Sequence, residues 1–330
     1  MLYPSLKASA EANRVVITGV GVLTGLGAGW EANAAGFRLG RPAFAPVTLF
    51  DVSRQRARIA AQAALPDPLP HTRLAPRRLQ RMDRAARLLL CATLEAWRQS
   101  GWETSDRLPF VLGTTSAGMS KGESYYRQSL STPGRPRNQA ARVLGYQAQR
   151  QVLDTADAVG FSGPTILISN ACASGANALG HAWSLLRSGR AHQALAGGYE
   201  GLCQLVFAGF DSLQALSPTP CRPFDANRDG LSIGEGAAIF ALETLEHASR
   251  RNAAILGEIA GYAAATDIHH LTQPHPDGDA ALTTMTAACR AAGVSPEAID
   301  YVNAHGTGTV LNDSSEAAAI NRWAGSRAPA

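Results

Sequence analysis

The sequence predicts an α/β fold, in which strands and helices alternate along the chain. Short runs rich in β-branched and small apolar residues are separated by stretches with helical periodicity, and this alternation is typical of sheets covered by helices. In addition, two distant stretches share one design, in which an apolar strand leads to a chemically functional residue and then to a helix. With 330 residues and 45% apolar content, the chain is long enough for one sizeable domain or for two fused halves.

The expected strands of the first 250 residues are short apolar runs, and the expected helices repeat apolar positions every three or four residues. The strands are expected at residues 14–20, 110–113, 166–168, 193–197 and 237–242. Helices are expected at residues 79–100, from Cys172 onward, and at residues 243–251. Residues 121–151 show two further helical patterns, separated by prolines at 133–136, and residues 199–210 are expected as helix or loop.

Two connecting stretches are expected to lack regular structure. Residues 19–25 are rich in glycine and predict a turn, but Thr24 stands where a dinucleotide-binding fingerprint needs its third glycine. Residues 42–76, rich in proline and arginine, predict an irregular connection. Because the sequence also has no Gly-Lys-Ser/Thr phosphate loop, a nucleotide cofactor is not expected.

The alternation continues to the C-terminal part of the chain. Residues 255–265 and 299–303 predict strands, and residues 279–292 predict a helix. Residues 312–323 predict a further helix, with Asn312 as its N-cap.

Residues 165–183 form the stretch on which the functional interpretation depends. The apolar run at residues 166–168 has the length and β-branching of a strand covered on both faces, and the helical pattern begins at Cys172. A thiol in the first turn of a helix faces unpaired N–H groups and the positive end of the helix dipole, which lower its pKa. The same N–H groups are suited to hold the oxyanion that forms when a thiolate attacks a carbonyl. The stretch therefore predicts a cysteine nucleophile.

A packing role is the alternative for Cys172, because a free cysteine is usually buried and unreactive. A second stretch favours catalysis, since residues 301–316 again place a short strand, then His305 followed by hydroxyls, then a helix. Ser174 is a poorer nucleophile candidate, because it lacks the glycine-flanked strained turn of serine hydrolases.

Three ordered motifs resemble those of the β-ketoacyl-acyl-carrier-protein synthases of the elongating I/II type. Asn-Ala-Cys-Ala-Ser-Gly at residues 170–175 resembles the nucleophile motif, and Asn-Ala-His-Gly-Thr-Gly-Thr at residues 303–309 resembles the first-histidine motif. Cys-Arg-Pro-Phe-Asp-Ala-Asn-Arg-Asp-Gly at residues 221–230 resembles a third block, in its expected place between the other two. The likeness runs from about Arg14 to the C-terminus.

The resemblance implies a thiolase-like fold, with layers in the order α-β-α-β-α, two similar halves, and a site where the halves meet. Residues 1–13 would then be an N-terminal tail. Residues 14–250 would form the N-terminal half, which carries the nucleophile, and residues 251–330 would form a partial C-terminal half, which carries the first histidine.

The resemblance also implies a reaction. Cys172 would take an acyl chain from a carrier-protein or CoA thioester, and a malonyl thioester would then lose CO2 and attack the acyl-enzyme to give a β-ketoacyl product. His305 would be one of two imidazoles that donate an N–H to the thioester carbonyl. The other implied site residues are Thr307 and Thr309 at the pantetheine arm, Asp267 and His270 in a loop at the mouth of the site, and Glu316, which orders the site. For the two threonines, capping of the turn after His305 is an equal alternative.

In the family, a later segment supplies a lysine, a second histidine in a Gly-His context and a Gly-Phe-Gly-Gly loop, and none of these motifs occurs in this sequence. We therefore expect a C-terminally truncated second half, with part of an apolar sheet unpaired. We also expect weak or absent condensation, because removal of members of a catalytic unit costs most of its power.

The net charge of +4 includes a basic cluster just before the Met82-Asp83 pair. The resemblance implies that Arg77, Arg78 and Arg81 help to dock the acidic acyl carrier protein, and a plain solvated helix face is the equal alternative. Nucleic-acid binding is not expected, because the cluster has no interleaved aromatic residues.

No metal site is expected, because the histidines at 269, 270 and 275 have no cysteine partner and no matching carboxylate spacing. Five scattered cysteines without a CxxC pair indicate a reducing cytoplasm. The chain shows neither a signal peptide nor an apolar run long enough to span a membrane, which predicts a soluble protein. The resemblance implies a homodimer, or a heterodimer with a related synthase.

Two hypotheses of different class follow. The first is a condensing enzyme of fatty acid, polyketide or polyene biosynthesis, and the second is a non-condensing partner subunit of the chain-length-factor type. The presence of both Cys172 and His305 favours the first, since a purely structural partner has no need for an activated thiol. A degradative thiolase is disfavoured, because residues 305–309 do not resemble that branch.

Overall fold

The computed structural model describes residues 13–103, 108–132, 134 and 140–325. Apart from Asn13, the predicted tail at residues 1–13 lies outside the described residues, and so do most of the prolines and their neighbours at 133–136.

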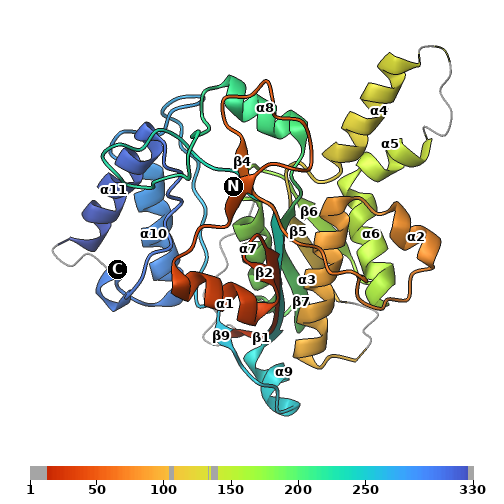
Figure 1. Ribbon diagram of the computed structural model, residues 1–330. Coiled ribbons are helices and arrows are strands. Elements are labelled where there is room, and N and C mark those ends of the chain that lie inside the picture. Colours follow the sequence, from red (N-terminus) through yellow and green to blue (C-terminus); the bar gives the residue numbers. More distant parts are fainter. Residues whose placement is uncertain (1–12, 104–107, 133, 135–139, 326–330) are drawn as a thin grey trace.

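A seven-stranded mixed sheet forms the centre of the molecule (Figure 1). Its spatial order is β2 (Gly27–Ala28), β1 (Val15–Thr24), β8 (Gly236–Thr244), β7 (Gln193–Glu200), β5 (Phe110–Gly113) and β6 (Thr165–Ile168), and β9 (Gly257–Glu258) also pairs with β1. Strands β7, β5 and β6 are parallel to one another, whereas β8 and β1 are joined by antiparallel pairing. The carboxyl ends of β7, β5 and β6 therefore lie at one edge of the sheet, with the end of β5 in the middle.

Helices cover both faces of this sheet. In chain order they are α1 (Trp30–Leu39), α2 (Pro76–Arg81), α3 (Arg84–Ser100), α4 (Met119–Ser131), α5 (Ala140–Tyr146), α6 (Ala148–Val159), α7 (Ser174–Arg187), α8 (Gln204–Ser212), α9 (Leu245–Arg250), α10 (Asp279–Ala292) and α11 (Val310–Ala324). Helix α3 anchors the larger apolar cluster on one face, and α7 anchors a second cluster on the other. The predicted α/β class is confirmed.

Helix α3 shows why the sequence folds locally as it does. Asp83 caps its start by accepting the N–H of Ala86 at 2.9 Å, and Gly101 ends it in the left-handed conformation with φ of 65°. Between these caps the apolar stripe is buried against the sheet. The single helix predicted over residues 79–100 is in fact α2 followed by α3, because Met82 and Asp83 adopt extended backbone between them.

The glycine-rich residues 19–25 were predicted as a turn, and this prediction is wrong. Strand β1 continues to Thr24, and its glycines let it approach α3 closely. A Cβ atom on Gly21 would lie only 1.8 Å from the carbonyl oxygen of Ala92, so any larger residue would push the helix off the sheet. The glycines thus serve packing rather than chain reversal.

Residues 42–76 also contain more regular structure than predicted, because β3 (Phe44–Pro46) and β4 (Ile59–Ala61) pair as a two-stranded sheet. The predicted two helical patterns within residues 121–151 are parts of three helices, α4, α5 and α6.

Strand β6 was predicted to be fully buried, but all four of its residues are only half-buried. Its faces are covered as expected, since Leu167 packs toward the α3 cluster and Ile166 toward the α7 cluster. The exposure comes from its place as the outermost strand of the described sheet. Strand order in space, which periodicity does not encode, makes the difference.

The C-terminal part departs most from the expected pattern. Only Gly257–Glu258 of the predicted strand at residues 255–265 pairs with a neighbour, and among the described residues the predicted strand at 299–303 pairs with none. A strand needs a partner for its backbone groups, so apart from β9 these runs remain outside a sheet. Helices α10 and α11 pack on each other through a small cluster that includes Cys289 and Trp323. Large apolar side chains in this part are exposed, among them Ile268, Leu271, Tyr301, Val310 and Leu311.

Two helix starts were also predicted wrongly. Helix α11 begins at Val310 with Thr309 as its N-cap, and the side chain of Asn312 donates to Asp313 at 3.1 Å instead of capping. Residue 243 does not start a helix, because β8 runs on to Thr244 and α9 begins at Leu245.

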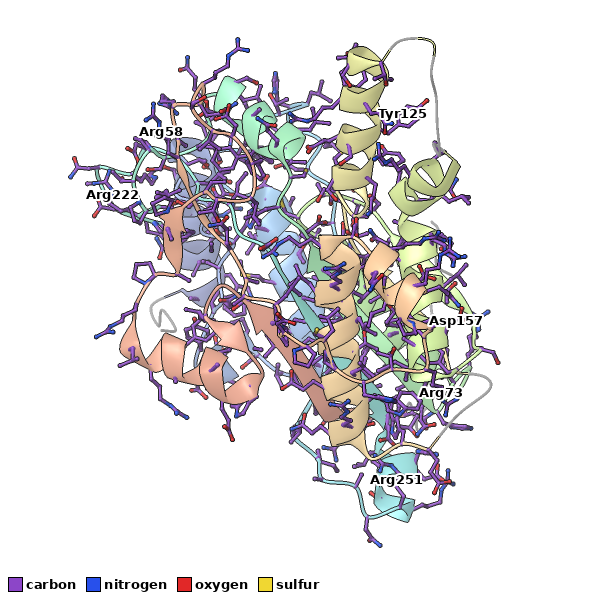
Figure 2. The ribbon with its side chains drawn as sticks, turned by 45° about the vertical axis from the view of Figure 1, so that its right-hand side comes forward. Arg58, Arg73, Tyr125, Asp157, Arg222 and Arg251 are labelled. Atoms are coloured by element: carbon purple, nitrogen blue, oxygen red, sulfur yellow. The ribbon has the colours of Figure 1, made fainter. Side chains whose placement is uncertain are left out.

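Glu243 is a fully buried carboxylate that ties α9 to the sheet. It accepts hydrogen bonds from Thr18 at 2.6 Å, from the indole N–H of Trp102 at 2.7 Å and from Arg251 Nε at 3.0 Å, and it pairs with His247 Nδ1 at 2.7 Å. Burial raises the pKa of Glu243, but the hydrogen bonds led by Arg251 outweigh it and lower the pKa to about 2. Arg251 lies at the end of the molecule formed by α9 (Figure 2).

Replacing Arg251 with methionine is expected to lower the free energy of unfolding by about 3 kcal/mol, because it leaves a buried carboxylate without its cation. The matched control is Arg250→Met, which removes an exposed ion pair with Glu246 and should change stability by less than about 0.5 kcal/mol. Urea unfolding of the three proteins checks this, and equal losses in both variants would contradict it.

The same comparison has a pH dependence. Because the folded-state pKa of Glu243 is about 2 and its ordinary value is 4.5, its stabilisation is complete above the ordinary value and is lost as pH falls through about 2. Acidification should therefore cost the wild type more stability than Arg251→Met, since that variant has already lost the interaction.

Candidate active site

The candidate site forms where three parallel strands end. Strand β6 leads to Cys172, β5 leads to the loop of residues 114–116, and β7 ends at Glu200. Because the strand order is β7, β5, β6, the loop after β5 lies between Glu200 and the turn that carries Cys172. Gly113, the last residue of β5, permits a close approach, since a Cβ atom there would lie 2.2 Å from the backbone of Ser174.

Cys172 lies in a tight turn just before α7. Ala171 has φ of 57°, a strained conformation for a residue other than glycine, and Ala173 is the N-cap. The helix was predicted to begin at Cys172, but it begins two residues later, at Ser174. The buried Ser174 hydroxyl donates to the Ala171 carbonyl at 2.6 Å and accepts the N–H of Asn170 at 2.9 Å, so it braces the turn and does not serve as a nucleophile.

His305 reaches Cys172 from the loop before α11. Glu316, one turn and more into α11, accepts the backbone N–H of His305 at 2.6 Å and of Gly306 at 2.8 Å. Its carboxylate therefore fixes the backbone that carries the imidazole, and its role in ordering the site for catalysis stays a prediction.

The thiol and the imidazole form a coupled pair. A hydrogen bond from His305 is the main cause that lowers the pKa of Cys172, while partial burial opposes it. The hydrogen bond to Cys172 likewise raises the pKa of His305, with smaller contributions from the charges of Glu316 and Asp313. Both shifts favour a thiolate next to an imidazolium, and the thiolate is the reactive form of a cysteine.

The buried cysteines behave in the opposite way. Burial raises the pKa of Cys91 to about 11 and that of Cys203 to about 12. Cys172 is also the exposed one among the five free thiols, while Cys221 is half-buried. Reactivity toward a carbonyl therefore concentrates at Cys172.

The third motif connects the two halves of the site. The buried carboxylate of Asp313 accepts the N–H of Phe224 at 2.7 Å and of Gly308 at 3.1 Å, and Arg228 Nε lies 3.7 Å from it. Residues 221–230 are thereby held against the loop that carries His305.

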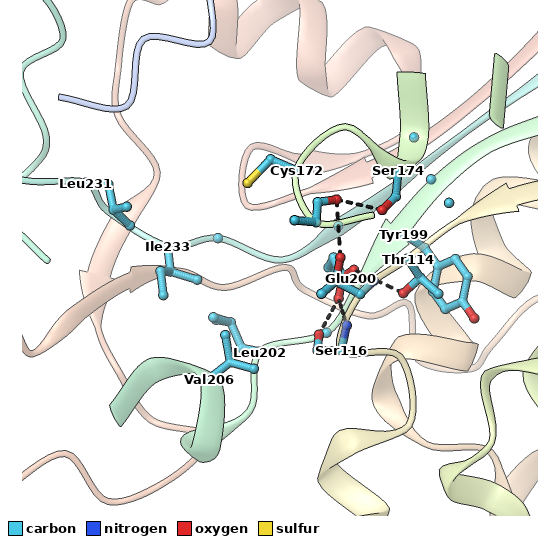
Figure 3. A pocket seen from close by; sticks show the side chains of 18 of the residues that line it. Thr114, Ser116, Cys172, Ser174, Tyr199, Glu200, Leu202, Val206, Leu231 and Ile233 are labelled. Atoms are coloured by element: carbon cyan, nitrogen blue, oxygen red, sulfur yellow. Dashed lines mark hydrogen bonds between the residues drawn. The ribbon is translucent and has the colours of Figure 1, made fainter. Parts of the chain in front are cut away.

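A cavity of about 710 Å³ opens beside the pair, and both Cys172 and His305 line it. One end is polar, with Thr114, Ser116 and Glu200. The other end has an apolar wall made of Leu202, Val206, Phe207, Phe210, Leu231 and Ile233. Figure 3 shows the Cys172 sulfur directed toward the side of Leu231 and Ile233. The arrangement suits an apolar chain attached to a carbonyl at the thiol.

The structure brings together only some of the predicted site residues. Thr307 lines the cavity and its hydroxyl lies 2.9 Å from that of Thr309. Asp267 and His270 do not line the cavity. Asp267 accepts the backbone N–H groups of His269 at 2.9 Å and His275 at 2.8 Å, so here it shapes its own loop. The predicted roles of Asp267 and His270 remain predictions.

The predicted docking arginines differ in environment. Arg78 is bound to α6 through Asp154 and through Asp157 at 2.7 Å, and its charge is largely compensated there. Arg77 and Arg81 are exposed on α2, so they are the two whose charge is available to a partner. Figure 2 marks Asp157 on α6.

Within the described residues, no group of three or more His, Cys, Asp or Glu side chains is arranged to hold a metal ion. Among the same residues, no helix is both long enough and apolar enough to cross a membrane.

Glu200 belongs to none of the three sequence motifs and was not predicted as a site residue. Its carboxylate lines the cavity and accepts hydrogen bonds from Thr114, Thr115 and Ser116. The available signal was an acidic residue at the end of a strand, but its importance depends on which strands are neighbours.

Comparisons with known proteins agree with this geometry. Residues 12–248 match the model of the beta-ketoacyl synthase N-terminal domain, and residues 256–330 match the model of its C-terminal domain. The 3-oxoacyl-[acyl-carrier-protein] synthase 2 of Synechocystis sp. is 34% identical over 333 residues, which cover 97% of this chain and 79% of that protein.

Solved ketosynthases share the fold. The ishigamide ketosynthase/chain length factor matches with a TM-score of 0.88 and 33% identity, over 97% of this chain and 79% of that one. A type II PKS acyl-carrier protein in complex with its ketosynthase matches with a TM-score of 0.82 and 27% identity, over 96% and 79%. The thiolase-like fold that the resemblance implied is therefore confirmed. Since the two domain models together cover almost the whole chain, the protein belongs to the beta-ketoacyl synthase family, whose members are acyltransferases.

Proposed function

We propose that this protein catalyses acyl transfer to Cys172 followed by decarboxylative Claisen condensation with a malonyl thioester on acyl carrier protein. The observation that carries the proposal is the Cys172–His305 pair, with the pKa of the thiol lowered, in the lining of a cavity that has an apolar wall. An apolar acyl chain would lie along that wall while its thioester carbonyl meets the thiol.

In the first step, the Cys172 thiolate attacks the thioester carbonyl, a new carbon–sulfur bond forms, and the carrier thiol leaves. In the second step, the malonyl thioester loses CO2 and the resulting carbanion attacks the acyl-enzyme, which breaks the bond to Cys172. We assign to His305 the stabilisation of the thiolate in the first step and the donation of an N–H to the malonyl carbonyl in the second. No cofactor is needed for either step.

The supporting assignments follow the positions of the residues. Glu316 would hold the His305 backbone, and Thr307, which lines the cavity, would bind the pantetheine arm together with Thr309. Asp267 and His270, which do not line the cavity, would act from their own loop. The family boundaries at residues 248 and 256 support the division into a nucleophile half and a histidine half.

The second candidate is a non-condensing partner subunit of the chain-length-factor type, and the similarity to a ketosynthase/chain length factor structure favours it. A purely shaping subunit gains nothing from a thiol whose pKa is lowered by a histidine, so this pair favours the condensing enzyme. Both candidates agree with a dimer, either of two copies or with a related synthase. Free cysteines along the chain support work in the reducing cytoplasm.

The test is incubation of the purified chain with an acyl-carrier-protein thioester and malonyl-carrier protein, with intact-mass spectrometry and CO2 release in parallel. The proposed function predicts an acyl adduct on Cys172 and CO2 release that depends on it. An adduct without CO2 release would leave acyl transfer only, and the absence of an adduct would favour the partner subunit.

The same assay tests carrier docking at Arg77 and Arg81. Reversing both charges to glutamate should slow transfer from the carrier-bound thioester at least about tenfold at low salt, because docking of an acidic partner depends on charge complementarity. Transfer from the matching pantetheine thioester, which has no protein surface, should be unchanged. An equal loss with both substrates would exclude a docking role.

A further inference from the structure

We propose that Glu200 is a positioning residue for the nucleophile, which it aims through the loop of residues 114–116. This inference rests on the proposed acyl transfer at Cys172 and assigns a residue that the site motifs do not include. Three observations carry it: the order of the strands, the hydrogen bonds of the carboxylate, and the link from the loop to the turn of Cys172.

The strand order makes the loop an intermediate between the two groups. Glu200 ends β7 and Cys172 follows β6, while β5 lies between these strands and leads directly into residues 114–116. A shift of this loop is therefore passed to the turn beside it. Figure 3 shows Glu200 between Thr114 and Ser116, with Cys172 on the adjacent turn.

The carboxylate of Glu200 is fully used in holding the loop. One oxygen accepts the Thr114 hydroxyl at 3.1 Å and the backbone N–H of Thr115. The other accepts the backbone N–H of Ser116 at 3.0 Å and the Ser116 hydroxyl. Four donors from three successive residues converge on one side chain, which fixes both the backbone and the side chains of the loop.

Thr115 transmits this order to the nucleophile. Its hydroxyl donates to the carbonyl of Ala171 at 3.2 Å, and the same carbonyl accepts the Ser174 hydroxyl at 2.6 Å. Ala171 is the residue with φ of 57°, and its strained conformation sets the direction in which Cys172 leaves the turn. Two hydroxyls from different elements thus hold the carbonyl that orients the reacting residue.

The effect of the Glu200 charge on the pKa of Cys172 distinguishes a role in positioning the thiol from a role in ionising it. The charge raises the pKa of Cys172 and so opposes the hydrogen bond from His305 that lowers it. A carboxylate at this edge of the cavity therefore does not help to form the thiolate. Its presence is explained by the four donors that it holds, because a neutral amide offers only one oxygen and would face an N–H with its own N–H2 group.

The first test uses Thr115, which carries the link but no charge. Thr115→Val keeps the backbone N–H to Glu200 and removes the hydroxyl that holds Ala171, so acyl transfer to Cys172 should fall about tenfold. Thr115→Ser restores the hydroxyl and should restore the rate. The pH midpoint of Cys172 alkylation by iodoacetamide should be the same in all three proteins, because no charge changes.

The second test uses Glu200→Gln. Removal of the negative charge should move the alkylation midpoint to lower pH, whereas acyl transfer measured above that midpoint should fall about tenfold, because the loop loses acceptors. A residue that only supports the fold would slow both reactions through loss of folded protein, which circular dichroism melting of each variant measures. Opposite changes in midpoint and transfer rate are the signature of positioning.

The outcomes are separate from those of the proposed function. If the wild type takes no acyl group, the function fails, yet a lowered alkylation midpoint in Glu200→Gln still places its charge at the thiol. If the wild type is acylated while Thr115→Val and Glu200→Gln transfer at its rate, the positioning role is overturned and the function stands. Failure of Thr115→Ser to restore transfer would also overturn it.

Discussion

Replacing Cys172 with alanine is expected to abolish formation of the acyl adduct, with a loss of at least about 10⁴-fold in transfer. Loss of the nucleophile removes the covalent step itself, and removal of one member of a catalytic unit costs nearly as much as removal of the whole. Intact-mass spectrometry after incubation with an acyl thioester measures the adduct directly.

The matched control is Cys289→Ala, the same atomic change at a buried thiol on α10 outside the cavity. It should acylate at the wild-type rate, even if its packing with Trp323 costs some stability. An adduct that persists in Cys172→Ala, or that disappears in Cys289→Ala, would place the nucleophile elsewhere.

Replacing His305 with alanine is expected to slow acyl transfer by about 10²- to 10⁴-fold, the usual contribution of a positioned acid or base. The physical reason is the coupled pair, because the imidazole provides the main hydrogen bond that lowers the pKa of Cys172. Stopped-flow or quenched mass measurements of adduct formation check the rate.

The pH dependence of Cys172 alkylation should also change in a defined direction when His305 is removed. Without His305 the pKa of Cys172 should rise toward its ordinary value, so the alkylation curve with iodoacetamide should move to higher pH. At a pH above both midpoints the two proteins should be alkylated at equal rates, since both thiols are then ionised. His192→Ala, at an exposed residue just before β7, serves as the control and should leave the curve in place. An unmoved curve in His305→Ala would contradict the pair.

The local predictions succeeded where residue type and spacing are sufficient. The apolar stripe between Asp83 and Gly101 specifies α3, because caps and periodicity act within one turn. The local predictions failed where the structure of a segment depends on which segments lie next to it in space. A β-branched run such as residues 166–168 is compatible with a strand in the middle of a sheet and with one at its edge. Glycines such as those in residues 19–25 are compatible with a turn and with a strand packed closely against a helix.

The predicted strand at residues 299–303 failed for a related reason. Apolar β-branched residues favour extended backbone, but a strand exists only when another segment supplies its hydrogen-bond partners. Within the described chain no segment does so for these residues. The prediction for Glu243 failed because a glutamate beside a helical pattern usually belongs to the helix, whereas here the buried partners Thr18 and Trp102 draw it into β8.

The sequence motifs alone identify the reactive residues of the site. They are a cysteine and a histidine, each after a strand and before a helix, in an order that resembles one family. Folding decided how they act. Only the strand order β7, β5, β6 brings Glu200 to residues 114–116 and brings that loop to the turn of Cys172. The paired residues are about 60 to 90 positions apart along the chain, a distance that no periodic sequence pattern predicts. Short-range patterns specify local conformation because their interactions lie within a few residues, whereas the charges and hydrogen bonds that tune a nucleophile depend on which distant segments the sheet places side by side.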